Sequence, residues 1–166
     1  MWDGERRSVS ISTGKERLMS EENRKAIRIS VRNLVEFVLR SGDIDNRRSG
    51  NAQKDAMLAG GRIHRKIQKR MGSGYRAEVP LKHEVQDEEQ EITLLVEGRA
   101  DGIFTENGIP VIDEIKGMYT DISRLEEPIE VHLAQAMCYG YFYCCDRNLD
   151  GVRIQLTYCN LETEEI

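Results

Sequence analysis

The chain has 166 residues, of which 39% are hydrophobic and 32% are charged, and its formal net charge at pH 7 is −5. This length suits one domain with a sizeable core, and the composition is typical of a globular protein with polar tails. The sequence has no apolar run long enough to span a membrane and no signal-peptide pattern. We therefore expect a cytoplasmic protein without a membrane partner.

The charges are distributed unevenly along the chain. Residues 1–83 hold 19 Lys and Arg against 10 Asp and Glu, whereas residues 84–166 hold 5 against 19. An asymmetry of this kind indicates that the first half faces a polyanion. Bound cations would offset part of the negative charge of the second half.

An arm and two helices are expected in the first half of the chain. Residues 1–26 are charged, rich in serine and weakly periodic, which predicts a flexible arm before a folded domain over residues 27–166. A first helix is expected from near Ser30 to Ser41-Gly42. A second helix is expected from about Asn51 to Met71, where alanine and isoleucine recur at helical spacing.

The second half of the chain predicts strands around a third helix. Pro128 suits the first turn of that helix, which continues to about Asp146. The expected strands are Tyr75–His83, Glu97–Phe104, Ile109–Lys116 and Val152–Cys159. This order of elements predicts the α/β class, with a mixed, mostly antiparallel sheet and helices on both of its faces.

A hairpin at Asn107-Gly108 is the sharpest local signal, because this dipeptide favours a two-residue type I′ turn. In the register that the turn sets, Asp101 lies opposite Glu114, and strand alternation places Lys116 on the face of Glu114. Two carboxylates at cross-strand distance repel each other unless a cation lies between them. This patch is therefore a candidate metal site.

Two alternatives stay open for this patch. The carboxylates could lie on an ordinary solvated sheet face that Lys116 neutralises. Pro110 lacks a backbone N–H and could force a bulge in the second strand. A slip of one residue would then place Asp101 and Glu114 on opposite faces.

The candidate metal site suits the hydrolysis of phosphodiesters. That reaction needs an activated water, a clamp on the phosphate and help for the leaving oxygen, and one or two divalent cations can supply all three. Asp101 and Glu114 would hold Mg²⁺, with the backbone carbonyl of Ile115 as a further ligand. Lys116 would orient the water or stabilise the charge that develops on the phosphate. His64 is a third candidate ligand that would shift the preference toward Mn²⁺, although a lone helical histidine is commonly an ordinary surface or core residue.

Two helices carry candidate DNA-binding residues. His132, Gln135 and Tyr139 are spaced i, i+3 and i+7 on one face of the third helix. This stripe contains no Lys or Glu, which a solvated stripe would favour, so we expect contacts with a phosphate or a base. Basic residues on the second helix would follow a phosphate backbone, or would form a solubilising face instead. They are Arg62, Arg65, Lys66, Lys69 and Arg70.

Taken together, these features resemble the PD-(D/E)XK nuclease superfamily, and within it the RecB-like branch, from about Arg28 to the C-terminus. The family has a Gly-x-x-His helix, a Gly-x-x-Asp-Gly strand, a carboxylate-x-Lys strand and a Gln-x-x-x-Tyr helix. All four occur here in that order. The matching segments are Gly61–His64, Gly98–Gly102 (loosely), Val111–Lys116 and Gln135–Tyr139.

The resemblance implies a restriction-endonuclease-like core and a role for each motif residue. Metal binding falls to His64, Asp101 and Glu114, catalysis to Lys116, and contacts with DNA to Gln135 and Tyr139. Asp113 would be a neighbour on the other face rather than a ligand. Glu78 lies in a strand that often carries an accessory acid in such nucleases, and it is a lesser candidate.

The activity implied by the resemblance is that of a Mg²⁺- or Mn²⁺-dependent deoxyribonuclease, most simply an exonuclease in DNA repair or processing. The chain is also similar to nuclease domains fused to DinG-type DNA helicases, so a helicase domain in a longer chain or complex is an expected partner besides DNA. One alternative is a catalytically silent DNA-binding module that guides a helicase. Another is a restriction-like endonuclease.

The cysteines depart from one pattern of the family. Many RecB-like relatives hold an iron–sulfur cluster with one cysteine before the histidine helix and three near the C-terminus. The first cysteine of this chain is Cys138, so we expect no iron–sulfur cluster. The four cysteines contain no C-x-x-C pair, and we interpret them as reduced thiols.

Overall fold

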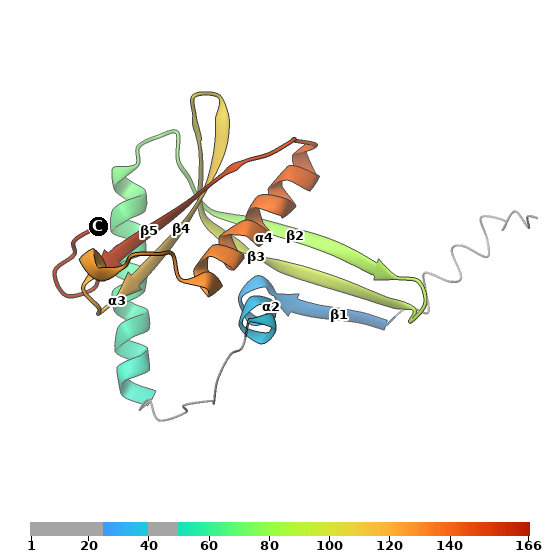
Figure 1. Cartoon of the computed structure of the whole chain (residues 1–166), viewed down its shortest axis with the longest axis horizontal. Helices are drawn as coiled ribbons and strands as arrows, with labels where there is room; N and C mark the ends of the chain where they lie inside the picture. The colour runs from blue at the N-terminus through green and yellow to red at the C-terminus, as the bar shows by residue number, and fades with distance from the viewer. Residues whose placement is uncertain (1–24, 40–49) are drawn as a thin grey trace, which may run out of the picture.

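The computed structural model describes residues 25–39 and 50–166, with side chains from residue 58 onward in the second range. The strands are β1 Lys25–Ser30, β2 Arg76–Asp87, β3 Ile92–Glu106, β4 Ile109–Met118 and β5 Arg153–Asn160. The helices are α2 Val31–Val38, α3 Gly50–Arg70 and α4 Glu130–Arg147, with a 3-10 turn η1 at Ile122–Arg124. The predicted α/β class is thus confirmed, with a mixed sheet flanked by helices (Figure 1).

Strand β3 organises the sheet because it pairs with three other strands. β2 runs antiparallel along one edge of β3, and the other edge is shared by β1 and β4. β1 pairs in parallel with residues 92–97, and β4 pairs antiparallel with residues 102–106. None of the described strands therefore pairs with residues 98–101 on that edge. β5 extends the sheet in parallel with β4.

This arrangement opens a fork in the sheet. Figure 1 shows β2 and β3 running away from β4 and β5 beyond the point where the four strands meet. We call the opening between residues 98–101 of β3 and residues 114–116 of β4 the fork. Backbone hydrogen-bonding groups at the fork are available to side chains, because no strand of the described ranges 25–39 and 50–166 pairs with this edge.

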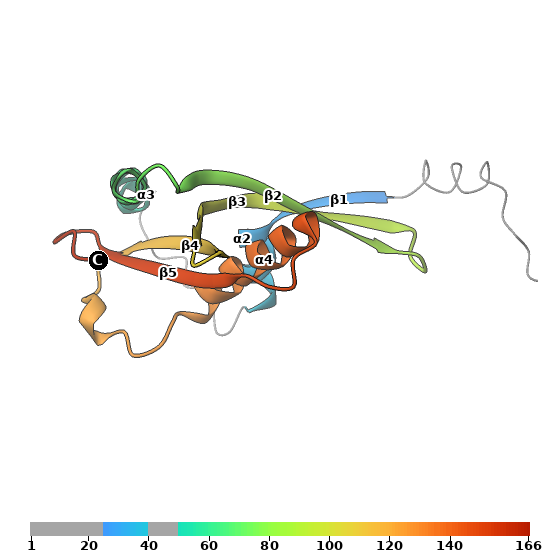
Figure 2. The same cartoon turned by 90° about the horizontal axis from the view of Figure 1, so that it is seen from above.

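The helices cover both faces of the sheet, as expected from the sequence. Helices α2 and α4 pack with Ile103 and Ile112 in one buried cluster, whereas α3 packs with Ile115 and Cys159 in another. Ile112 and Ile115 lie on opposite faces of β4, as strand alternation requires. Figure 2 shows α3 on one side of the strands and α4 on the other. Among the described residues, no helix has the length and apolar character needed to cross a membrane.

The prediction for residues 25–30 is wrong. Residues 25–30 form strand β1, although the arm was expected to reach residue 26 and the next element was expected to be a helix. The sequence has no local signal for β1, because this strand forms by pairing with residues 92–97, which are distant in the chain. Ser30 does begin the helix, since its hydroxyl accepts a hydrogen bond of 3.1 Å from the amide of Asn33. Residues 1–24 and 40–49 of the predicted arm and helix end lie outside the described residues.

The predicted hairpin register is confirmed. Glu106 pairs with Ile109, and the ladder continues in step to Gly102 opposite Asp113. Pro110 takes its place in this ladder opposite Thr105 without a slip. The turn chemistry of Asn107-Gly108, where both residues have positive φ, fixes this register locally.

Strands β2 and β3 share a kink at Glu78 and Asp101, which lie between the ladder pairs Ala77–Gly102 and Val79–Ala100 and are not themselves a ladder pair. Ala100 and Ile103 belong to the same buried cluster although they are three residues apart, so the alternation of β3 breaks between them. Glu78 has a φ of 53°, a left-handed conformation that costs a non-glycine residue about 1–2 kcal/mol. Strain of this kind concentrates at functional sites, and here it lies beside the fork.

Gly102 next to this kink has no room for a side chain. A Cβ atom at this position would lie 1.8 Å from the hydroxyl of Tyr75, which is buried and donates a hydrogen bond of 2.8 Å to Asp113. We therefore expect Gly102→Ala to destabilise the protein by about 2 kcal/mol or more, measured by urea unfolding. Gly74→Ala is the matched control, because nothing lies within 4 Å of its Cβ position. Equal midpoints for both variants would contradict this packing.

Candidate active site

Asp101 links three elements at the fork. Its Oδ2 accepts a hydrogen bond of 2.7 Å from the amide of Ile115 on β4, beyond the last ladder pair. Its Oδ1 lies 3.3 Å from Nδ1 of His64 on α3. Its backbone carbonyl accepts a hydrogen bond of 3.0 Å from Nε2 of Gln68, one turn further along α3. Asp101 therefore holds α3 and β4 together across the fork.

Glu114 supplies a buried carboxylate with an unused oxygen. Its side chain is 1% exposed, and its Oε1 lies 2.7 Å from Nζ of Lys116. Nζ of Lys116 also donates a hydrogen bond of 3.1 Å to Oε1 of Gln135 on α4. Oε2 of Glu114 is the buried side-chain oxygen that has no hydrogen-bond partner among the described residues. An unpartnered buried carboxylate oxygen is costly, so its position calls for a cation or donor that binds there.

Asp101 and Glu114 flank the fork in the register that the sequence predicts, but they are not a ladder pair. The ladder ends at Gly102 opposite Asp113, because the kink turns β3 away and the Asp101 carboxylate takes the amide of Ile115. Asp113 faces the other side of the sheet, as expected. It accepts hydrogen bonds from Tyr75, Gln155 and Thr157.

A group of three possible metal ligands, which we call the donor group, lies beside Glu114. His64, Glu78 and Asp101 each offer a ligand atom, and these atoms lie within 4.8 Å of one another. Gln68 donates a hydrogen bond of 3.2 Å to Oε1 of Glu78, which orients that carboxylate. Carboxylate oxygens suit Mg²⁺ and Mn²⁺, and the imidazole nitrogen favours Mn²⁺. The residues present therefore fit a divalent cation, with Glu114 completing the negative charge of the site.

The pKa values of the site show how strongly its charges interact. Burial and the charge of Asp101 raise the pKa of Glu114 while Lys116 opposes the rise, and the resulting value is about 7. For His64, burial lowers the pKa, but the hydrogen bond and negative charge of Asp101 outweigh it, and the net shift is upward. Both groups thus take up protons in the absence of a cation. A bound cation would displace those protons.

Tyr139 fills the gap on the edge of β3. Its hydroxyl forms hydrogen bonds with the backbone of Arg99 and with the side chain of Gln135. Burial and the charge of Glu114 raise the pKa of this hydroxyl to about 12. Gly98 leaves room for this hydroxyl, since a Cβ there would lie 2.5 Å from it. Gln135 and Tyr139 therefore lie in the site with Lys116 and Glu114, as the sequence predicts.

The other predicted DNA-binding residues lie outside the fork, in different surroundings. Nδ1 of His132 lies 3.3 Å from the hydroxyl of Tyr158, so this ring is engaged beside the site rather than in the fork. Nη2 of Arg62 lies 3.7 Å from Oε1 of Glu164, which also pairs with Lys66. Arg65 and Lys69 are exposed along α3.

His132 gives a pH-dependent prediction. Burial lowers its pKa to about 4, with help from the charges of Lys116 and Arg32. The unfolded chain binds the proton at about pH 6.5, so stability falls as the pH drops from 6.5 toward 4. We expect this loss to be roughly 2 kcal/mol smaller in His132→Gln than in the wild type, measured by urea unfolding at both ends of that range. Parallel pH profiles would contradict it.

Two residues of the site were not predicted from the sequence, or were predicted only as lesser candidates. Gln68 was missed, although its i+4 spacing from His64 places both on one face of α3 and could have found it. Glu78 was a lesser candidate, and the structure brings it to the donor group because of its left-handed φ. No local sequence signal marks a glutamate for that conformation.

Comparisons with known proteins define the fold only. No family model and no curated protein matches the chain. Among solved structures, the chain is similar to the crystal structure of SSO0001, with a TM-score of 0.55 and 20% sequence identity, over 88% of this chain and 69% of that chain. At this identity the likeness shows a shared α/β fold.

Proposed function

We propose that this chain is a Mg²⁺- or Mn²⁺-dependent deoxyribonuclease that hydrolyses phosphodiester bonds at the fork. The observation that carries this proposal is the buried Oε2 of Glu114, which has no hydrogen-bond partner in the described part of the chain, while Asp101 and His64 lie within electrostatic reach. A purely structural carboxylate at 1% exposure would have its oxygens satisfied.

We assign cation binding to the residues that offer donor atoms at the fork. His64, Asp101 and Glu114 would hold the cation, with Glu78 as a further donor and the carbonyl of Ile115 as a predicted ligand. A divalent cation bound there supplies an activated water and polarises the phosphate. The Asp101 carboxylate keeps its orientation through the amide of Ile115, and this orientation exists before any ligand binds.

Lys116 is the group placed to act on the phosphate. Its ammonium is held between Glu114 and Gln135, and its side chain is 23% exposed. An oriented ammonium in this position stabilises the negative charge that develops on a phosphate oxygen, or orients the attacking water. Tyr139 steadies Gln135 and so keeps the ammonium in place.

The surface of α3 supports a polyanionic substrate. Arg65 and Lys69 are exposed on the helix that carries His64, and basic side chains beside a catalytic site follow a phosphate backbone. Arg62 contributes less to this surface, because Glu164 offsets its charge. The choice of DNA rather than RNA comes from the resemblance to RecB-like nucleases, as does the attachment to a helicase domain. The free cysteines accord with a place in the cytoplasm.

Cleavage of labelled DNA tests this proposal. Purified protein is incubated with end-labelled linear DNA and with circular DNA, each with Mn²⁺, with Mg²⁺ and with chelator. We expect the linear DNA to be shortened from its ends only when a cation is present, and the circular DNA to stay intact. Cuts in the circle would favour the endonuclease instead. Binding without any cleavage would overturn the proposal and leave a DNA-binding module.

A further inference from the structure

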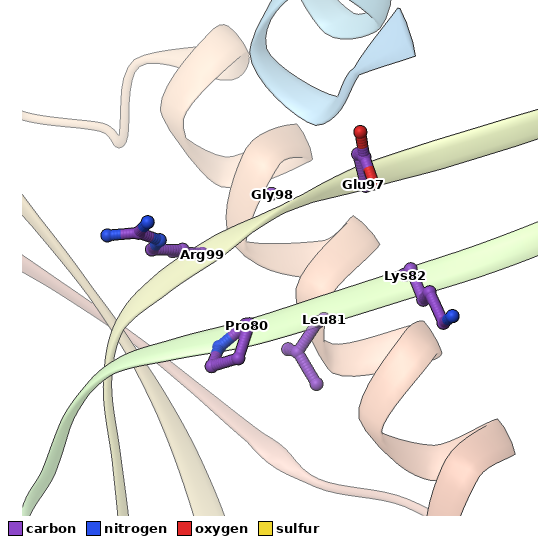
Figure 3. A pocket seen from close by; sticks show the side chains of 6 residues that line it. All are labelled: Pro80, Leu81, Lys82, Glu97, Gly98 and Arg99. Carbon is purple, nitrogen blue, oxygen red and sulfur yellow. The ribbon is translucent and has the colours of Figure 1, made fainter. Parts of the chain in front are cut away.

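A pocket lies on β2 and β3 beside the fork. Its volume is about 480 Å³. Figure 3 shows the six residues that line it, with α4 behind the two strands. They are Pro80, Leu81, Lys82, Glu97, Gly98 and Arg99. None of the roles assigned so far uses the side chains of these residues.

The register of β2 and β3 explains the shape of the pocket. Pro80 pairs with Arg99 and the pair Lys82–Glu97 follows two residues away, so strand alternation places these four side chains on one face. Between them, Leu81 packs in the buried cluster that α2 and α4 form with Ile103 and Ile112, and Gly98 has no side chain. The two outer pairs therefore form the walls, and the backbone between them forms the floor.

The pocket continues the line of the cation-binding residues. Glu78 and Asp101 come two residues before Pro80 and two residues after Arg99, and their carboxylates lie together with His64 at the fork. Two residues of a strand span about 6.6–6.8 Å. The pocket thus begins about one side-chain row from the place where the phosphate would be cleaved, with Arg99 on the near side.

The charges of the pocket favour an anion with an apolar part. Arg99 is exposed, and neither it nor Lys82 forms an ion pair with any described residue. The acid in the pocket, Glu97, already lies 3.8 Å from Nη1 of Arg28. Two available cations and the apolar ring of Pro80 suit a phosphate joined to a sugar and a base.

We propose that this pocket is the subsite for the nucleotide next to the cleaved phosphate, held by Arg99 and Lys82. The inference rests on the proposed nuclease function and adds where the rest of the substrate lies. The volume is within the range of small-ligand sites and suits one nucleotide. In this inference the strand at the site is single there, and the pocket fixes its position relative to the fork.

Binding in the presence of chelator tests the pocket without cleavage. A fluorescent single-stranded oligonucleotide is titrated with wild type, Arg99→Ala, Lys82→Ala and Arg124→Ala. Arg124 is the matched control, because it is an exposed arginine on η1 far from this face in the sheet order. We expect the first two variants to weaken binding at least about tenfold and the control to leave it unchanged. Equal binding by all four proteins would overturn the inference.

Amide chemical shifts separate a nucleotide from a simple anion. Titration with thymidine monophosphate should change the chemical shifts of the Gly98 and Arg99 amides. Inorganic phosphate at the same concentration should cause only a small part of that change. If phosphate alone reproduces the whole pattern, the pocket is only an anion site and the inference fails.

Cleavage kinetics with Mn²⁺ separate the two proposals. We expect Arg99→Ala and Lys82→Ala to raise KM at least about tenfold with kcat near the wild-type value. If the wild type cleaves and both variants match Arg124→Ala, the pocket fails and the nuclease stands. If the wild type cleaves nothing while the binding pattern holds, the nuclease fails and a nucleotide site remains.

Discussion

Glu114→Gln is expected to lower the kcat/KM for DNA cleavage by about 10³-fold while the protein stays folded. The substitution keeps the shape of the side chain and removes one negative charge from the donor set that Asp101 and His64 share. Cleavage is measured on linear DNA with Mn²⁺. Glu126→Gln is the matched control, because Glu126 is an exposed glutamate in the loop before α4.

The same substitution is expected to stabilise the protein at about pH 8. The pKa of Glu114 is about 7 in the folded state against an ordinary value of 4.5, so the folded state binds more protons between these values. Stability therefore falls as the pH rises through this window, by up to about 3 kcal/mol. An amide carries no charge at any of these pH values, although its burial has a cost of its own. We expect a net gain of roughly 1 kcal/mol in urea unfolding.

Lys116→Met should have the same effect on activity and the opposite effect on stability. Removing the ammonium leaves the buried charge of Glu114 without its cationic partner, which we expect to cost about 2 kcal/mol at about pH 8. Loss of activity in two folded variants whose stabilities shift in opposite directions would show that the loss of activity does not follow from the change in stability. Full cleavage by either folded variant would contradict the proposed site.

The local features of the site could be predicted from the sequence. Asn107-Gly108 sets the register of the hairpin through its own backbone preferences, and this register brings Asp101 and Glu114 to the fork. Helical spacing similarly places Gln135 and Tyr139 on one face of α4. Such features depend on residues that are neighbours in the chain, so a single sequence contains them.

The features that depend on distant contacts could not be predicted. The kink at Glu78 exists because two strands turn together, and a glutamate carries no signal for a left-handed φ. Strand β1 forms against residues 92–97, far along the chain. Arg62 is drawn to Glu164 at the other end of the chain, which removes part of the expected basic surface. Tertiary contacts decide each of these outcomes over local propensity.

Mn²⁺ should raise the melting temperature more at about pH 8 than at about pH 6. A cation at a hundred times its Kd adds about 2.7 kcal/mol of stability, which corresponds to roughly 5–10 °C for a chain of this size. Protons compete for the same groups. Because its pKa is about 7, Glu114 is mostly protonated at about pH 6. This protonation lowers the affinity for the cation by about tenfold, or about 1.4 kcal/mol.

His64 acts in the same direction, because its pKa is also raised and a protonated imidazole cannot bind a cation. We expect the thermal shift at about pH 6 to be no more than about half of that at about pH 8. Glu114→Gln should show a small shift at both pH values. His64→Gln should lose more of the Mn²⁺ shift than of the Mg²⁺ shift, because imidazole ligation favours Mn²⁺. This measurement needs no substrate, so equal shifts at both pH values in the wild type would remove Glu114 from the cation site whatever the cleavage assay shows.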